Sequence, residues 1–201
     1  MCGHAHCDAL SSELSVRNRP VFVNCGTYQY QGQKRSFFRS TKAHNTVVID
    51  GKEQSELWGE HRAARRIHGL QCVYEENTVT GKYHTYSGNV HERTLDKVNE
   101  NCIKVTDRIT VSKKVQVSLY LHIAPEFWFK KNNGCIEVRE KRNDALCLSI
   151  VFNQGKAIIH KGEEDCVYSS DFGKIEENET LEIKYWADTG TTENSLTIRI
   201  Y

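Results

Sequence analysis

The sequence has few residues that interrupt or cross-link a chain. Its 201 residues include two prolines and one methionine. No apolar run approaches the roughly 20 residues that a membrane-spanning helix needs, and we see no basic and then apolar stretch typical of a secretory signal. Lysine and arginine number 27 against 26 acidic residues. This balance argues against a nucleic acid or an anionic membrane held by bulk charge.

The eight cysteines are too few and too irregularly spaced for a disulfide scaffold. No Cys-x-x-Cys pair occurs, so a four-cysteine zinc ribbon or a thioredoxin-like site is not expected. Cys102, Cys135 and Cys147 lie in apolar, strand-like runs, and we expect them to be small core residues. The cysteines do not fix the redox compartment.

Alternation of apolar and polar residues is the dominant pattern. In "VQVSLYLHI" (115–123), every second residue from Val115 to Ile123 is apolar, which is typical of a half-buried strand. The same pattern occurs in "CIKVTDRITV" (102–111) and "SLTIRIY" (195–201). Turn residues such as Asp50-Gly51 and Lys161-Gly162 separate such runs.

About a dozen short strands joined by turns indicate an all-β fold, an antiparallel β-sandwich of two sheets. No linker or repeat divides the chain, so we predict one domain over residues 1–201. Residues 55–67, "SELWGEHRAARRI", alternate poorly and carry many charges. We expect a loop or a short helix there.

Two histidines stand two positions apart in "GHAHCDAL" near the N-terminus. In an extended segment His4 and His6 would point the same way, so both rings could reach a metal ion or an acid–base site. A surface strand that happens to carry two histidines is the alternative. Both interpretations remain open on this pair alone.

Aromatic, arginine and asparagine residues gather in the first third of the chain. Aromatic rings stack on sugar rings, and guanidinium groups bind carboxylate or sulfate. We therefore predict a binding site for a sugar acid, with the substrate-binding residues Tyr28, Tyr30, Arg35, Arg39 and Asn45. Whether the two tyrosines lie in the core or in a cleft stays open.

Several short motifs occur together in this region. They are "GHAH" (3–6), "DALS" (8–11), "GTY" (26–28), "FRST" (38–41), "AHNTVV" (43–48) and "DG" (50–51). In this order they resemble the heparinase II/III-like family of bacterial polysaccharide lyases. The likeness covers the C-terminal β-sandwich of that family.

The resemblance implies a longer enzyme. Family members combine an N-terminal helical toroid with the sandwich and cleave uronate-containing polysaccharides by β-elimination in the cleft between them. A base removes the proton α to the carboxylate, and an acid assists the glycosidic oxygen. The resemblance thus implies two partners, an anionic polysaccharide or uronate oligosaccharide and the toroid, and no activity for residues 1–201 alone. It also suggests the bacterial periplasm.

The resemblance also implies residue roles. His4 corresponds to the active-site histidine of the sandwich, and His6 and His44 correspond to ligands of a zinc ion. The third ligand is an aspartate in the family, whereas this chain has Asn24. A neutral amide oxygen weakens a Zn²⁺ site. Cys25, the next residue, is a possible substitute ligand.

Two other functions compete with the lyase interpretation. One is a non-catalytic carbohydrate-binding or scaffold module, and the other is a zinc-stabilised domain whose cysteines join the metal site. Five further histidines show no partner pattern, and we expect them on the surface or on strands: His61, His68, His84, His91 and His160.

Overall fold

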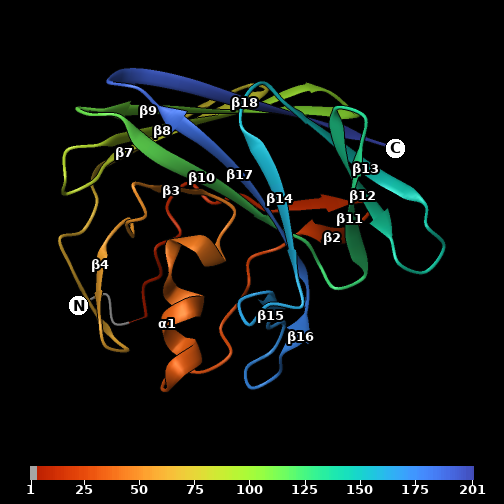
Figure 1. Cartoon of the computed structure of the whole chain (residues 1–201), viewed down its shortest axis with the longest axis horizontal. Helices are drawn as coiled ribbons and strands as arrows, with labels where there is room; N and C mark the ends of the chain where they lie inside the picture. The colour runs from red at the N-terminus through yellow and green to blue at the C-terminus, as the bar shows by residue number, and fades with distance from the viewer. Residues whose placement is uncertain (1–3) are drawn as a thin grey trace.

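The computed structural model describes residues 4–201 and consists mainly of strands (Figure 1). It contains one α-helix, α1 (Gln33–Arg39), and one 3-10 helix, η1 (Thr41–Ala43). Within this part of the chain no helix is long and apolar enough to cross a membrane. The strands are β1 (Leu14–Val16), β2 (Arg19–Phe22), β3 (Val47–Ile49), β4 (Glu56–Trp58), β5 (Arg62–Ala64), β6 (His68–Glu75), β7 (Thr78–His84), β8 (Val90–Asn99), β9 (Cys102–Val111), β10 (Val115–His122), β11 (Phe127–Asn132), β12 (Cys135–Glu140), β13 (Leu146–Phe152), β14 (Lys156–Lys161), β15 (Val167–Tyr168), β16 (Glu176–Glu177), β17 (Glu179–Ala187) and β18 (Gly190–Ile200).

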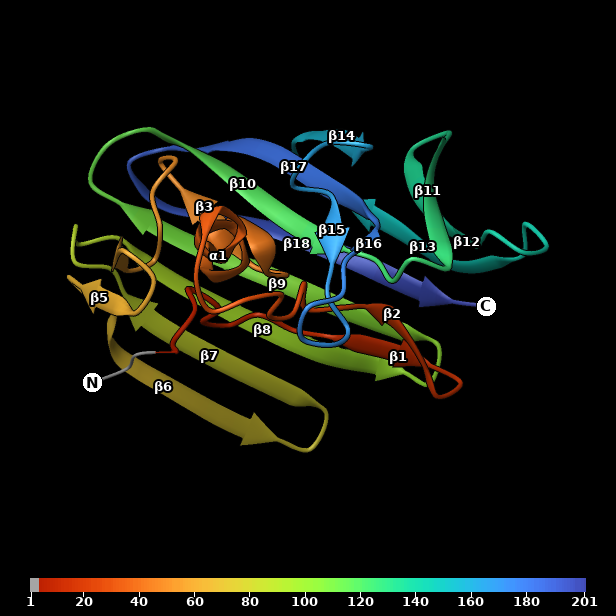
Figure 2. The same ribbon diagram turned by 90° about the horizontal axis from the view of Figure 1, so that it is seen from below.

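Two antiparallel sheets form the body of the molecule. The larger has eight strands in the order β11-β12-β13-β18-β9-β8-β7-β6, and the smaller has four in the order β14-β17-β10-β3. Figure 2 shows β10 and β17 lying across the larger sheet. Three two-stranded ribbons, β1–β2, β4–β5 and β15–β16, complete the fold. The predicted antiparallel β-sandwich is confirmed.

The main core lies between the two sheets and follows the alternation in the sequence. Val117, Leu119 and Leu121 of β10 are buried on one face of the smaller sheet. Ile109 of β9 and Ile198 of β18 belong to the same apolar cluster. Each such side chain stabilises the fold by about 1.5–3 kcal/mol on burial, so the core is formed by the periodicity of the strands.

The segment between β2 and β3 leaves the sandwich and builds a second, smaller cluster. Phe38 of α1 packs with Cys25, Ala43 and Val167. Gly32, which precedes α1, has a φ of 95°, a conformation that favours glycine. The short helix therefore follows a glycine, and its one buried aromatic ring, Phe38, packs into this second cluster.

Residues 55–67 differ from the expectation of a loop or short helix. They form the β4–β5 hairpin, in which Glu56 faces Ala64 and Trp58 faces Arg62. Gly59, at the turn, has a φ of 53°. A turn that needs a positive φ, rather than apolar alternation, determines this hairpin.

The cysteine prediction is confirmed for one residue of three. Cys147 is buried within β13, whereas Cys102 and Cys135 are partly exposed. The latter two are the first residues of β9 and β12, next to the hairpin turns, where the core does not extend. Every cysteine from Cys7 to Cys166 is a free thiol.

A buried ion pair links the larger sheet to the N-terminal segment. Arg93 of β8 donates from Nε and Nη2 to the two carboxylate oxygens of Asp107 in β9, at 2.8 and 2.9 Å. Its Nη1 donates to the carbonyl oxygens of Leu10 and Asn45 at 2.8 and 2.6 Å. Burial opposes ionisation of Asp107, but Arg93 and His91 together hold the pKa of this carboxyl well below its usual range.

His122 is a neutral histidine buried at the end of β10. Its Nε2 donates to the carbonyl oxygen of Lys42 at 2.8 Å, and the Thr180 hydroxyl lies 2.9 Å from Nδ1. Burial lowers the pKa of His122 to about 4. Between this value and the ordinary value of about 6.5, the unfolded chain binds a proton that the folded chain does not.

We therefore predict that acid destabilises the protein partly through this residue. Its contribution to the free energy of unfolding should fall by about 1 kcal/mol per pH unit between about pH 6 and pH 5. Urea unfolding of the wild type and of His122→Gln at both pH values measures this contribution. His68→Gln is the control, because His68 is exposed. An unchanged pH slope in His122→Gln would contradict the assignment.

Candidate functional site

The N-terminal segment is fixed to the loop between β3 and β4 and to the end of α1. Ala9 donates its amide to Oε1 of Gln54 at 2.9 Å, and Nε2 of Gln54 donates to the Ala9 carbonyl at 2.9 Å. The Cys7 amide donates to the carbonyl of Arg39 at 2.9 Å. These bonds place His4 on the surface and His6 half inside, behind it.

Four rings from four segments meet around His4. The His4 ring lies 4.8 Å from the Tyr30 ring and 5.8 Å from the His61 ring, measured between centroids. Tyr30 in turn lies 5.1 Å from Phe172, in the loop between β15 and β16. Tyr30 and Phe172 are 45% and 63% exposed. We call His4, Tyr30, His61 and Phe172 the ring cluster.

Backbone hydrogen bonds explain why Phe172 reaches the ring cluster. The Gly173 amide donates to the carbonyl of Tyr28 at 2.8 Å, which joins the 171–174 turn to the loop before α1. The Tyr28 ring itself packs 6.2 Å from Phe38 in the small apolar cluster. Of the two tyrosines whose location the sequence left open, Tyr30 thus faces the surface and Tyr28 lines the inside.

Two fully buried arginines position the hairpin turn that carries His61. Arg39 donates to the carbonyl oxygens of Ala5, Gly59 and Arg62, at 3.2, 2.9 and 3.1 Å. Arg35 donates from Nε to the Glu60 carbonyl at 3.3 Å. Because Arg39 contacts both Ala5 and the β4–β5 turn, it sets the separation of His4 and His61.

Asn45 is also buried, and its polar atoms have partners. Its Nδ2 donates to the carbonyl oxygens of Ser12 and Val23 at 2.9 and 3.1 Å, and its Oδ1 accepts from the His122 amide at 2.7 Å. Arg39 and Asn45 were expected to contact substrate. The structure places both as supports beneath the site rather than as groups on its surface.

Sequence reasoning missed His61 and Phe172. Neither residue has a local pattern that marks it, because their contacts with the ring cluster arise only from the folded turns. The other four histidines without a partner pattern lie on strands, as expected, but all four have partners. His91 contacts Asp107 at 2.6 Å, His160 lies 2.9 Å from Glu182, and His68 stacks on His84 at 5.5 Å.

The two histidines for which the resemblance implies a metal do come together. Nδ1 of His6 lies 3.3 Å from Nε2 of His44. Two nitrogen ligands of one tetrahedral zinc ion are also about 3.3 Å apart, given Zn–N bonds of about 2.0–2.1 Å. The spacing alone therefore suits a zinc ion as well as a hydrogen bond.

The remaining contacts fit a zinc ion poorly. Oδ1 of Asn24 accepts from the Gly26 amide at 2.8 Å, and it is a neutral oxygen. Nη1 of Arg35 lies 3.0 Å from Nε2 of His6 and brings a positive charge to the pair. In residues 4–201 no group of three or more His, Cys, Asp or Glu side chains could hold a metal ion. The residues present supply two good ligands and no carboxylate.

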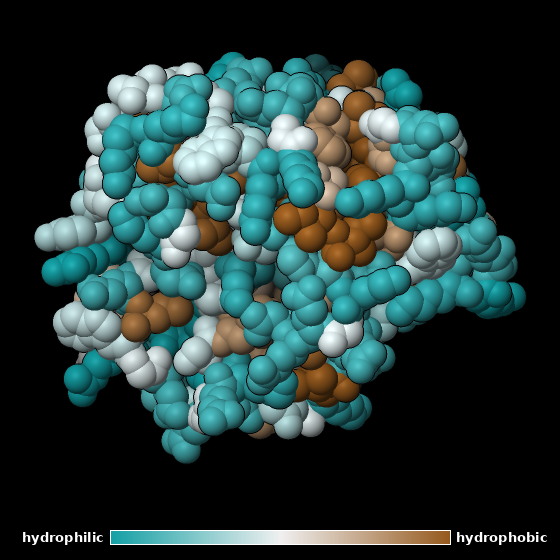
Figure 3. Space-filling view, in the orientation of Figure 1, coloured by the Kyte–Doolittle hydropathy of each residue, from teal (hydrophilic) through white to brown (hydrophobic). Residues whose placement is uncertain are grey.

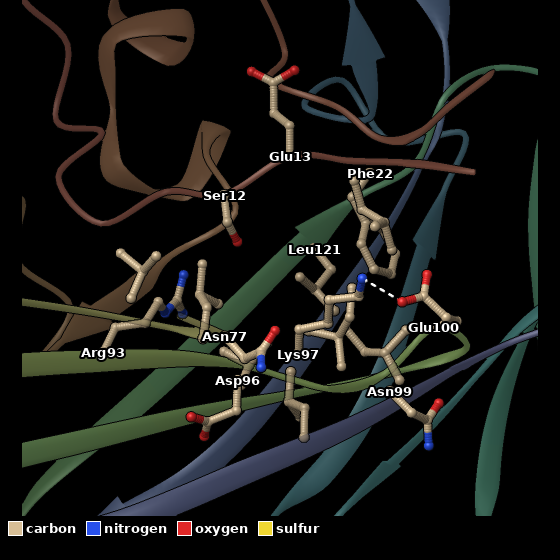
Figure 4. A pocket seen from close by; sticks show the side chains of 17 residues that line it. Ser12, Glu13, Phe22, Asn77, Arg93, Asp96, Lys97, Asn99, Glu100 and Leu121 are labelled. Atoms are coloured by element: carbon tan, nitrogen blue, oxygen red, sulfur yellow. Dashed lines mark hydrogen bonds and ion pairs between the residues drawn. The ribbon is translucent and has the colours of Figure 1, made fainter. Parts of the chain in front are cut away.

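The pocket in Figure 4 is separate from the ring cluster. It measures about 300 Å³, and Leu95, Ile103 and Val105 of the larger sheet contribute to an apolar lining. Lys97 and Glu100 form an ion pair 2.7 Å long at its rim. No member of the ring cluster lines it. Figure 3 shows that the face seen in Figure 1 is mostly hydrophilic, with hydrophobic patches of which the largest lies in the upper right.

Comparisons with solved structures agree with this fold. The chain is similar to heparan sulfate lyase HepC from Pedobacter heparinus, with a TM-score of 0.76 and 16% identity over 98% of this chain and 31% of that chain. The Heparinase III-BT4657 gene product gives the same values. A crystal structure of heparinase III gives a TM-score of 0.71 and 16% identity over 99% of this chain and 30% of that chain.

The chain thus spans less than a third of the length of each of these structures. No curated protein sequence is significantly similar to it. The family described as heparinase II/III-like, C-terminal, matches residues 1–197. Because this match covers nearly the whole sequence, the chain belongs to the heparinase II/III-like C-terminal family.

Proposed function

We propose that the chain is the C-terminal domain of a polysaccharide lyase that cleaves an anionic, uronate-containing polysaccharide by β-elimination. In this proposal the ring cluster is the part of the substrate cleft that the domain contributes. Family membership supports the reaction class. The observation that carries the proposal is the exposed His4 ring held between Tyr30 and His61.

The ring cluster has the properties of a sugar-binding surface. The faces of Tyr30 and Phe172 offer exposed apolar area with a fixed orientation, which suits stacking against a sugar ring. The Arg35 guanidinium carbon lies 5.5 Å from the centroid of the Tyr30 ring. Arg35 is fully buried next to Tyr30, so it would attract an acidic sugar through its positive charge and not by direct contact.

His4 suits the proton transfers of β-elimination. In that reaction the C–H bond α to the carboxylate breaks, the bond to the glycosidic oxygen breaks, and a carbon–carbon double bond forms. The departing oxygen takes up a proton, so one base and one acid are needed. An exposed histidine can serve in either role near neutral pH. The second group and the group that neutralises the carboxylate are proposed to lie in the helical toroid.

A non-catalytic carbohydrate-binding module remains the second candidate, and one observation favours it. The exposed groups of the ring cluster are rings, with His4 next to Tyr30 and His61, while Arg39 and Asn45 are occupied inside the fold. Such a surface binds a sugar without the full set of groups for elimination. The third candidate, a zinc-stabilised domain, would need His6 and His44 as metal ligands.

Our first functional prediction concerns binding. Titration of the chain with a heparan sulfate or alginate oligosaccharide should shift the NMR signals of His4, Tyr30, His61 and Phe172. Phe172→Ala should weaken binding about fivefold, the equivalent of roughly 1 kcal/mol of stacking. Trp186→Ala is the matched control, because Trp186 is 55% exposed and lies on β17. Equal weakening by both variants would argue against the ring cluster as the binding surface.

A second functional prediction separates a lyase from a binding module. Residues 1–201 alone should release no unsaturated uronate product, whereas the longer protein with its toroid should release it. His4→Ala in that longer protein should lower turnover by at least roughly a hundredfold, with an unchanged melting temperature because the ring is exposed. His84→Ala is the control. Full turnover in His4→Ala, or by the short chain, would show that the catalytic groups are elsewhere.

A further inference from the structure

A continuous row of hydrogen bonds joins Arg35, His6, His44 and the Ser40 carbonyl. Nη1 of Arg35 lies 3.0 Å from Nε2 of His6, and Nδ1 of His6 lies 3.3 Å from Nε2 of His44. Nδ1 of His44 then lies 2.8 Å from the carbonyl oxygen of Ser40. Arg35 and His44 are fully buried, and His6 is half-buried.

The groups at the two ends of this row, Arg35 and the Ser40 carbonyl, determine which ring nitrogens of His6 and His44 carry a proton. A guanidinium can only donate, so Nε2 of His6 must accept and carry no proton. A carbonyl can only accept, so Nδ1 of His44 must carry a proton. The one remaining contact is then satisfied when Nδ1–H of His6 donates to Nε2 of His44. Both imidazole rings are then neutral, and each of their four nitrogens has a hydrogen-bond partner.

The same proton assignment excludes a metal ion between the two rings. A metal bound there would need the lone pairs of Nδ1 of His6 and Nε2 of His44. Nε2 of His6 already accepts from Arg35, so His6 would have to lose its last proton as well. Zinc could therefore bind only if Arg35 moved away from His6.

The electrostatic surroundings agree with a neutral pair. Burial, followed by the neighbouring His44, Arg35 and Arg39, lowers the pKa of His6 to about 4. Burial also lowers the pKa of His44.

We propose that this domain joins its N-terminal segment, α1 and the turn after η1 through a metal-free pair of histidines. Arg35 completes the pair and replaces the zinc ion that the family resemblance implies. Asn24 stands where the resemblance implies an aspartate ligand, and the Arg35 contact occupies the His6 nitrogen that would otherwise be free. The His6 ring is thereby fixed two residues from His4, at the base of the ring cluster.

The wild-type chain provides the first test, since no variant is needed. Protein purified without chelator should contain far less than one zinc per chain by elemental analysis. Its melting temperature should be the same in excess zinc and in a chelator. Long-range ¹H–¹⁵N NMR should show a proton on Nδ1 and none on Nε2 for both His6 and His44. One zinc per chain, or a proton on Nε2 of His6, would overturn the proposal.

Two variants test the role of Arg35 separately. Asn24→Asp restores the carboxylate but leaves Arg35 on His6, so it should still bind no zinc at micromolar concentration. Asn24→Asp combined with Arg35→Leu frees Nε2 of His6 and should bind one zinc, with a higher melting temperature in its presence. The matched control combines Asn24→Asp with Arg65→Leu, whose side chain is 61% exposed. Stoichiometric zinc in Asn24→Asp alone would contradict the assigned function of Arg35.

Discussion

The buried ion pair between Arg93 and Asp107 is the interaction on which the candidate site depends. Its two strands, β8 and β9, belong to the larger sheet, but Nη1 of Arg93 reaches out of the sheet to Leu10 and Asn45. Loss of one partner would leave an uncompensated buried charge, which costs about 3–5 kcal/mol. The pair therefore fixes an irregular N-terminal segment to two inner strands of the larger sheet.

From this contact the site is built outward by a few buried polar groups. Asn45 joins the N-terminal segment to β10, and Arg39 joins Ala5 to the turn that presents His61. Each group donates to backbone carbonyls of separate segments and so fixes these segments to one another. The exposed rings can therefore hold a fixed arrangement although none of them lies in a strand.

The sandwich was predictable because its strands alternate with a period of two, as in β9, β10 and β18. The convergence of His6 and His44 across 38 positions was predictable only from the motifs they share with the family. The β4–β5 hairpin, the position of His61 and the contact of Phe172 with Tyr30 were not predictable, because turn geometry and long-range hydrogen bonds determine them. The supporting roles of Arg39 and Asn45 were missed for a related reason. A polar residue on a surface and one that satisfies buried carbonyls look the same in a sequence.

The most direct test of this account is amide hydrogen exchange in Arg93→Met, with Arg139→Met as the control, since Arg139 contacts Glu137 at 2.6 Å in β12. We predict that protection of the Cys7, Ala9 and Asn45 amides falls by roughly a hundredfold or more in Arg93→Met, while amides of β12 and β13 keep their protection. The control variant should leave the three amides unchanged. Unaltered protection of the N-terminal segment in Arg93→Met, or an equal loss across all strands, would contradict the claim that this ion pair holds the site in place.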